Sequence, residues 1–185
     1  MLAVEVNLSC PNVEARGNVF AHSEDATRTA MRAVVEALGD ATPTFAKLSP
    51  NVTDIVGIAG AALDAGATGL TLVNSVMGLL IDARARAPRL GAGGGGLTGP
   101  PIKPVALRAV WDVARAFPGV AIIGTGGVTT GVDAIEMMLA GASAVGVGTA
   151  TFADPRAALR IVREIEAWCA ANRVEHVREL IGDMR

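Results

Sequence analysis

Gly124-Thr125-Gly126-Gly127-Val128 and Gly146-Val147-Gly148-Thr149-Ala150 each follow a short apolar run, and this pair of turns is the main evidence for the fold class. Glycine lets backbone N–H groups approach an anion closely, so the turns predict a phosphate site, although Gly-Gly pairs also occur in ordinary turns. Parallel α/β barrels commonly hold a phosphate on the loops after their last two strands. A doubly wound sheet normally carries its glycine fingerprint after a single strand, usually the first. The sequence therefore favours a barrel.

Short β-rich runs alternate with stretches of helical period on both sides of these turns. Strands are predicted at residues 4–8, 44–48, 69–73, 121–124 and 144–147, and helices at residues 24–38, 52–63, 104–117 and 131–139. A last helix is predicted to begin at Asp154-Pro155 and to pack Cys169 in the core. No segment resembles a linker, so residues 1–185 are predicted to form one α/β domain with a parallel sheet.

The glycine turns also indicate which strands of a barrel the chain contains. If the runs before them are strands 7 and 8 of a TIM (β/α)8 barrel, the run at residues 4–8 is strand 4. The chain then holds about the last five βα units, and we expect three units to be missing. Residues 4–8 and 144–147 would be open edges beside an exposed apolar inner face, so we expect association rather than a well-behaved monomer.

Composition restricts the partners. The 185 residues are 51% hydrophobic with a formal charge of −2, which suits one soluble domain with a substantial core. Basic residues are scattered, so neither nucleic acid nor an anionic membrane is an expected partner, and small metabolites are favoured. The apolar stretch at residues 65–81 is interrupted by polar residues and is shorter than the roughly 20 residues of a spanning helix. Without a signal peptide pattern, we expect a cytoplasmic protein with reduced thiols.

Residues capable of chemistry directly follow the predicted strands. The hexapeptide Asn7-Leu8-Ser9-Cys10-Pro11-Asn12 offers a thiol that can act as a base and amides that suit a planar polar ligand. A buried cysteine beside a Pro-Asn turn is the structural alternative. Lys47 is one of two lysines against fourteen arginines, which favours a need for a compact ammonium over a side chain that snorkels from a strand end. His22 and His176 have no partner at metal-ligand spacing, so no intrinsic metal is expected.

Longer motifs give the sequence a family resemblance. Their order resembles that in dihydroorotate dehydrogenases: Asn7 to Asn12, Lys47-Leu48-Ser49-Pro50-Asn51, Val73-Asn74-Ser75, Gly95-Gly96-Leu97-Thr98-Gly99-Pro100-Pro101-Ile102-Lys103-Pro104 and Gly126-Gly127-Val128. Cysteine at position 10 resembles class 1, since class 2 enzymes carry serine there. The stretches at residues 11–20, 51–55 and 148–155 are most similar to the NAD-linked class 1B catalytic subunit rather than to the fumarate-linked form.

The resemblance implies oxidation of dihydroorotate to orotate in de novo pyrimidine biosynthesis, with FMN accepting the hydride. It makes Cys10 the catalytic base and Asn7, Asn12, Asn74 and Ser75 the pyrimidine-binding residues, where Asn74-Ser75 as a plain turn is the alternative. Lys47 would lie beside the flavin ring, and Gly99 would approach FMN. The phosphate would lie on Gly126, Gly127, Gly148 and Thr149. Lys103, flanked by prolines, can equally serve to stiffen its loop.

The resemblance also implies partners. A class 1B enzyme passes its electrons to NAD through a second subunit that carries FAD and an iron–sulphur cluster, and we expect a homo-oligomer. Two alternatives remain open at this level. One is the related pyrimidine-reducing domain of dihydropyrimidine dehydrogenase, against which Asn12 after the proline argues. The other is a non-catalytic, truncated half-barrel that binds phosphate or a partner without turnover.

Overall fold

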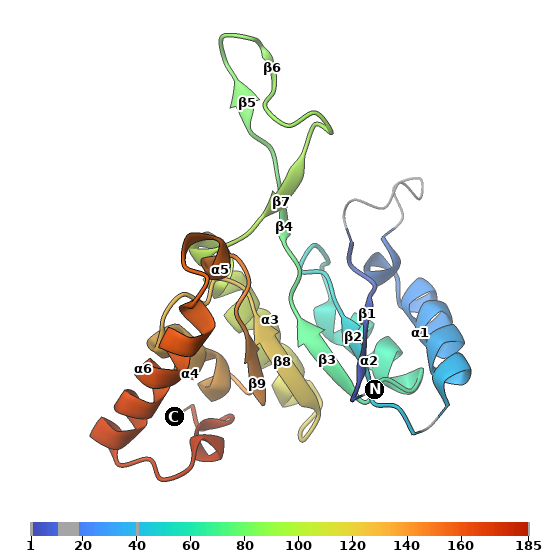
Figure 1. Cartoon of the computed structure of the whole chain (residues 1–185). Coiled ribbons are helices and arrows are strands. Elements are labelled where there is room, and N and C mark those ends of the chain that lie inside the picture. Colours follow the sequence, from blue (N-terminus) through green and yellow to red (C-terminus); the bar gives the residue numbers. More distant parts are fainter. Residues whose placement is uncertain (1, 11–18, 40, 185) are drawn as a thin grey trace.

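A parallel sheet forms the centre of the molecule (Figure 1). The computed structural model describes residues 2–10, 19–39 and 41–184. The sheet has the order β1-β2-β3-β8-β9, with neighbouring strands parallel throughout. The strands are β1 (Val4–Asn7), β2 (Thr44–Lys47), β3 (Gly69–Leu72), β8 (Ala121–Thr125) and β9 (Ala144–Gly146). Consecutive strands lie side by side without a reversal of order, which is the pattern of a barrel wall and confirms the predicted α/β class.

The connecting helices form a single layer in which each contacts the next. They are α1 (Glu24–Leu38), α2 (Ile55–Asp64), α3 (Lys103–Ala116), α4 (Gly131–Leu139) and α6 (Ala157–Asn172). The predicted bounds of α1 and α4 are confirmed. Helix α2 begins three residues later than predicted because Asp54 is its N-cap, where the side chain accepts a hydrogen bond from Gly57 N.

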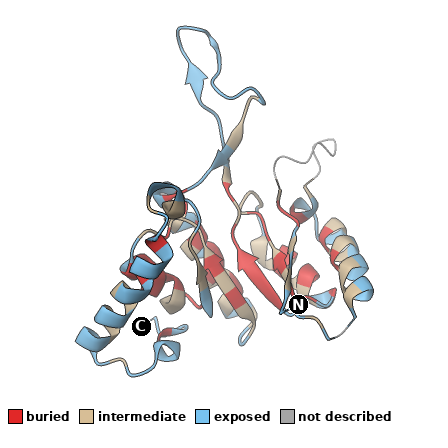
Figure 2. Ribbon diagram, viewed as in Figure 1, coloured by how far each residue is buried: buried red, intermediate tan, exposed pale blue. Residues whose placement is uncertain are grey.

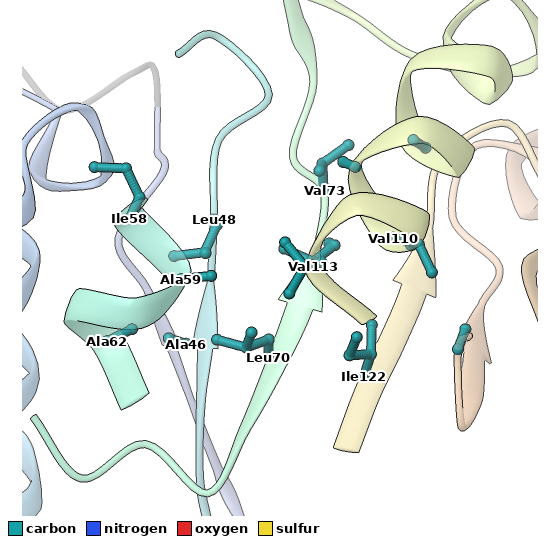
Figure 3. Close-up of a cluster of buried hydrophobic side chains, with 14 of the residues drawn as sticks. Ala46, Leu48, Ile58, Ala59, Ala62, Leu70, Val73, Val110, Val113 and Ile122 are labelled. Carbon is teal, nitrogen blue, oxygen red and sulfur yellow. The ribbon is translucent and has the colours of Figure 1, made fainter. Parts of the chain in front are cut away.

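The hydrophobic core lies between this helical layer and one face of the sheet. Small side chains allow close packing here, since α2 presents Ala59 and Ala62 toward the strands (Figure 3). The buried part of the molecule follows the sheet and the inner sides of the helices (Figure 2). The labelled core residues come from strands and helices alike: Ala46, Leu48, Ile58, Ala59, Ala62, Leu70, Val73, Val110, Val113 and Ile122.

The opposite face of the sheet differs from the expected apolar surface. Because side chains alternate along a strand, this face carries Glu5, Lys47 and Thr71 from three adjacent strands. Only part of it is apolar, notably where the Phe45 ring lies over Gly69 and occupies the space a side chain there would need. The prediction of an exposed apolar inner face therefore holds only in part, because polar side chains from three strands lie on it. The two open edges are confirmed, because β1 and β9 each have one strand neighbour among the described residues.

An arm over residues 76–97 projects from the end of β3 and was not predicted from the sequence (Figure 1). Its strands pair antiparallel, β4 (Val76–Gly78) with β7 (Gly95–Leu97) and β5 (Ile81–Asp82) with β6 (Ala87–Pro88). Strands of two or three residues are too short to produce a readable alternation. The arm is almost entirely exposed (Figure 2), so its apolar residues do not mark a core segment.

The last helix also departs from the prediction. A short α5 (Ala150–Ala153) comes first, and α6 begins at Ala157, so Asp154-Pro155 precedes the helix rather than starting it. Helix α6 buries Ala157 and Ile161, and Cys169 is half-buried rather than a core residue. Three 3-10 turns, η1 (Phe20–His22), η2 (Pro100–Ile102) and η3 (Val177–Leu180), complete the described chain. Among the described residues, no helix has the length and apolar character needed to cross a membrane.

Candidate active site

A cavity of about 140 Å³ lies at the carboxyl ends of the strands. Eight of the residues singled out in the sequence line it together: Lys47, Asn74, Ser75, Gly99, Gly126, Gly127, Gly148 and Thr149. Five further residues of its wall were not predicted: Val73, Thr98, Ile102, Thr125 and Val128. All five lie within stretches quoted from the sequence, so the signal was proximity to a candidate residue.

The two glycine turns play different structural roles in the wall. Gly126 and Gly127 have positive φ values of +133° and +78°, and added Cβ atoms would lie 2.7 Å from those of Ala106 and Lys103, respectively. These glycines therefore let the loop after β8 pass close to the start of α3. Gly148 differs, because a Cβ atom there would meet nothing within 4 Å.

Carboxylates already occupy the N-terminus of α4, next to the first glycine turn. Asp133 Oδ2 accepts hydrogen bonds from the N–H groups of Thr129 and Thr130 at 2.9 and 2.8 Å. Glu164 Oε2 accepts from Gly131 N at 2.5 Å. An anion would therefore have to bind elsewhere in these loops.

Backbone donors are available at the cavity itself. Within the described residues, the N–H groups of Gly126, Gly127, Gly148 and Thr149 donate no hydrogen bond to a backbone or side-chain acceptor. Unbonded N–H groups on residues that line a cavity are a donor set suited to a phosphate, which brings several acceptor oxygens and negative charge.

Lys103 has a structural role. Its Nζ lies 2.6 Å from Asp133 Oδ1 and 2.6 Å from Glu136 Oε2, which ties α3 to α4, and it does not line the cavity. These two hydrogen bonds raise the pKa of Lys103 above its ordinary 10.5. Burial by itself would raise the pKa of Asp133, but the hydrogen bonds from Lys103, Thr129 and Thr130 prevail and hold that pKa well below 3.8.

Polar side chains from β1 and β3 meet beside the cavity. Asn74 Nδ2 donates to Ser9 Oγ at 2.9 Å and lies 3.5 Å from Asn7 Oδ1. Ser9 Oγ in turn donates to Asn7 Oδ1 at 3.1 Å. The structure thus joins two of the predicted pyrimidine-binding residues, Asn7 and Asn74, through buried Ser9, which lies within the quoted hexapeptide but is not one of the predicted site residues.

Asn51 fixes the position of the loop after β3. Its Nδ2 donates to Ser75 O at 3.0 Å, and its Oδ1 accepts from Met77 N at 2.9 Å. The Ser75 side chain also packs closely against Gly96 at the root of the arm. Asn51 is the last residue of one of the quoted motifs, but its distance from Ser75 in the sequence gave no indication of the hydrogen bond between them.

The remaining predicted residues are placed as follows. Lys47 lines the cavity with its side chain 28% exposed, and its Nζ lies 3.7 Å from Glu5 Oε1. Cys10 is half-buried and follows directly on Ser9. Asn12 lies outside the described residues. No group of three His, Cys, Asp or Glu side chains in the described ranges is placed to hold a metal ion.

Comparisons with known proteins now bear on this geometry. The family model described as "Dihydroorotate dehydrogenase" matches residues 2–168, which is most of the chain. The chain belongs to the dihydroorotate dehydrogenase family. Among its relatives is the "Dihydroorotate dehydrogenase B (NAD(+)), catalytic subunit" of Geobacter sulfurreducens, 52% identical over 97% of this chain and 58% of the relative. The protein of that name from Desulforamulus reducens is 47% identical over the same shares.

Solved structures show the same family fold. The ligand-free DHODH of Eimeria tenella is 28% identical, with a TM-score of 0.79 over 97% of this chain and 54% of that one. The DHODH of Eimeria tenella in complex with ferulenol gives a TM-score of 0.78 at 27% identity. The chain therefore spans little more than half the length of the dihydroorotate dehydrogenases that it matches. The similarity to the B-type catalytic subunits confirms the class 1B resemblance.

Proposed function

We propose that this protein belongs to an FMN-dependent dihydroorotate dehydrogenase, which oxidises dihydroorotate to orotate in de novo pyrimidine biosynthesis. It contributes the binding sites for the FMN phosphate and for the pyrimidine substrate. One observation carries the proposal. A single cavity collects free backbone N–H groups, an ammonium and the Asn74-Ser75 pair from loops that are far apart in sequence. These three kinds of group match an anionic phosphate, an electron-rich ring and a polar pyrimidine.

The residues present fit part of FMN. Gly126, Gly127, Gly148 and Thr149 would hold the phosphate through backbone N–H groups, and the Lys47 ammonium would face the ring system. At about 140 Å³ the cavity is smaller than the roughly 300 Å³ at which pockets for whole ligands begin. The described residues therefore supply one portion of the FMN site rather than an enclosure for the whole group.

The reaction removes a proton from one ring carbon of dihydroorotate and a hydride from its neighbour, leaving the double bond of orotate. Bound FMN would supply the hydride acceptor. The Cys10 thiolate would take the proton as a general base. Asn7, Asn74 and Ser75 would hold the pyrimidine by pairing their amide and hydroxyl groups with its alternating carbonyl and N–H groups.

The partners follow from the same proposal. Relatives named as catalytic subunits of an NAD-linked enzyme support a second subunit, with FAD and an iron–sulphur cluster, that passes electrons to NAD. Exposed apolar residues on the arm support a homo-oligomer: Met77, Leu79, Leu80, Ile81, Leu90 and Leu97. The two open sheet edges support a requirement for further strands before turnover occurs.

Flavin reduction tests the proposal. The 185-residue chain and a version extended to the length of its relatives are titrated with FMN and mixed with dihydroorotate under anaerobic conditions. We expect FMN to bind and the extended protein to reduce it, with a rate that rises with pH as more thiolate forms. Cys10→Ala should abolish reduction while FMN stays bound.

Three outcomes separate the alternatives. Reduction of FMN by dihydroorotate supports the proposed reaction. Bound FMN that is reduced only in the presence of other dihydropyrimidines favours the dihydropyrimidine dehydrogenase alternative. Absence of FMN binding in both proteins favours a non-catalytic half-barrel and overturns the proposal.

A further inference from the structure

Three polar residues on the inner face of the sheet are not accounted for by substrate or phosphate binding. Glu5, Lys47 and Thr71 belong to the adjacent strands β1, β2 and β3. Thr71 Oγ1 donates to Glu5 Oε2 at 2.6 Å, and Lys47 Nζ lies 3.7 Å from Glu5 Oε1. The carboxylate thus has one oxygen toward the hydroxyl and the other toward the ammonium.

This polar arrangement is unusual, because barrels usually fill this face of the sheet with branched apolar side chains. Thr71 is 3% exposed, so its position is fixed, and its hydroxyl fixes one oxygen of Glu5. A short hydrogen bond to a carboxylate is stronger than one between neutral groups. Glu5 is therefore held more firmly than a lone surface carboxylate would be.

Lys47 gains a defined position from this support. A lysine side chain has four rotatable bonds, and it loses considerable conformational entropy when it is held in one position. Lys47 reaches the wall of the cavity, and the Glu5 carboxylate is its ion-pair partner. An ammonium has three donors, so this contact leaves others free to face the cavity.

We infer that Glu5, supported by Thr71, is a positioning residue that holds the Lys47 ammonium at the cavity wall and limits the positive charge that the cavity presents. The inference rests on the proposed function only for the identity of the bound ring. Without the carboxylate, the ammonium samples more positions and its charge is no longer partly neutralised. Because the negative charge of Glu5 is removed as well, the cavity becomes more positive, and a ring that becomes electron-rich on reduction would be stabilised more.

The composition of the chain provides a direct test that needs no ligand. Lys47 and Lys103 are the two lysines, so limited acetylation followed by mass spectrometry gives the reactivity of Lys47 relative to Lys103 within one molecule. Lys103 is paired with Asp133 and Glu136 and shares no contact with Glu5, which makes it an internal reference. We expect Glu5→Gln to raise the Lys47 to Lys103 ratio about two- to fivefold, the range for releasing a partly exposed ion pair.

Thr71 supplies a matched pair of variants. Thr71→Val removes the hydroxyl at nearly constant volume and should raise the ratio in the same direction by a smaller factor. Thr71→Ser keeps the hydroxyl and should restore the wild-type ratio. An unchanged ratio in both Glu5→Gln and Thr71→Val, in proteins with wild-type unfolding midpoints, overturns the inference whether or not FMN binds.

A second measurement connects the positioning role to the proposed cofactor. In FMN-loaded protein, Glu5→Gln should shift the flavin midpoint potential to more positive values, because the freed ammonium favours the electron-rich reduced ring. Failure of the wild-type chain and its extended form to bind FMN would count against the proposed function, while the acetylation ratio would still decide the role of Glu5. A midpoint potential that becomes more negative in Glu5→Gln would contradict the inferred effect on charge.

Discussion

The two ends of the cavity are built in different ways. The proposed phosphate end consists of backbone N–H groups on two loops, and Asp133 and Glu164 hold the loop after β8 through hydrogen bonds. The amide end consists of side chains, where Asn7, Ser9 and Asn74 bond to one another beside the cavity. At the first end the proposed binding groups belong to the backbone and are independent of residue identity as long as the loop keeps its shape. At the second end the side chains themselves are the proposed binding groups.

This difference shows where substitutions should act. Changes at the phosphate end should matter through charge, space and loop support. Changes at the amide end should alter ligand selection while leaving the loops intact.

A carboxylate at Gly148 should weaken FMN binding most. The position is open, since a Cβ atom there meets nothing within 4 Å, so Gly148→Asp places a charge beside the phosphate without a steric clash. Unit charges about 4 Å apart repel by about 4 kcal/mol in a partly buried site, which corresponds to about a thousandfold in Kd. Fluorescence titration with FMN measures the effect.

Gly148→Asn is the control because it has the same size and no charge. It should bind FMN within a few-fold of the wild type. Gly127→Asp is a poorer test, since its Cβ would lie 2.7 Å from that of Lys103 and its φ is +78°. Equal affinities of Gly148→Asp and Gly148→Asn would place the phosphate elsewhere.

Loss of the Asp133 carboxylate should destabilise the support of the phosphate loop. Asp133→Asn leaves the Lys103 ammonium with Glu136 alone and weakens the bonds to Thr129 and Thr130. Breaking a partly buried pair on one side costs about 3 kcal/mol of unfolding free energy. Urea denaturation measures this loss, and Asp112→Asn, which breaks the exposed pair with Arg108, should change the midpoint far less.

The pH dependence of stability gives an independent check of Asp133. Its pKa is held below the ordinary 3.8, so its stabilising contribution is complete above the unfolded value and is lost as pH falls toward the folded value. The difference in unfolding free energy between wild type and Asp133→Asn should therefore be constant near neutral pH and shrink below about pH 4. A difference that grows in acid would contradict the pairing.

At the amide end, Asn74→Ala should reduce the affinity for the pyrimidine without affecting FMN. Removing the amide leaves polar groups of the ligand unpaired, at about 1 to 3 kcal/mol, or about five- to 150-fold in KM. Steady-state kinetics of the extended protein measures KM, and FMN content is recorded in parallel. Asn172→Ala on α6, whose amide bonds only to Trp168 O among the described contacts, should leave both values unchanged.

The smallest effect is expected at the root of the arm. Gly96→Ala places a methyl group against the Ser75 side chain and should push the hydroxyl from its place, at about 1 kcal/mol. We expect a several-fold rise in KM with a nearly unchanged kcat. Gly91→Ala, farther along the arm where a Cβ meets nothing within 4 Å, should behave like wild type. Identical KM values for the two variants would remove Ser75 from the pyrimidine site.

Local patterns in the sequence were enough to predict the strands of the sheet, the order of the elements and most of the cavity wall. Strands at residues 4–8 and 44–48 were predicted within one residue of β1 and β2, because alternation along a strand and the helical period are local patterns. The glycine turns predicted the proposed phosphate end for a similar reason. The proposed role needs only a flexible backbone at the end of a strand, and that requirement is visible in the residue type.

The tertiary structure alone decided which distant residues meet. Glu5 and Thr71 are 66 positions apart, and Asn51 reaches Ser75 across 24 positions, so no local period could reveal either contact. The same limit explains the arm and α6, where apolar residues such as Leu80 and Leu159 are exposed. An apolar residue type indicates that burial is favourable. Whether the side chain is buried depends on whether the fold places another segment against it.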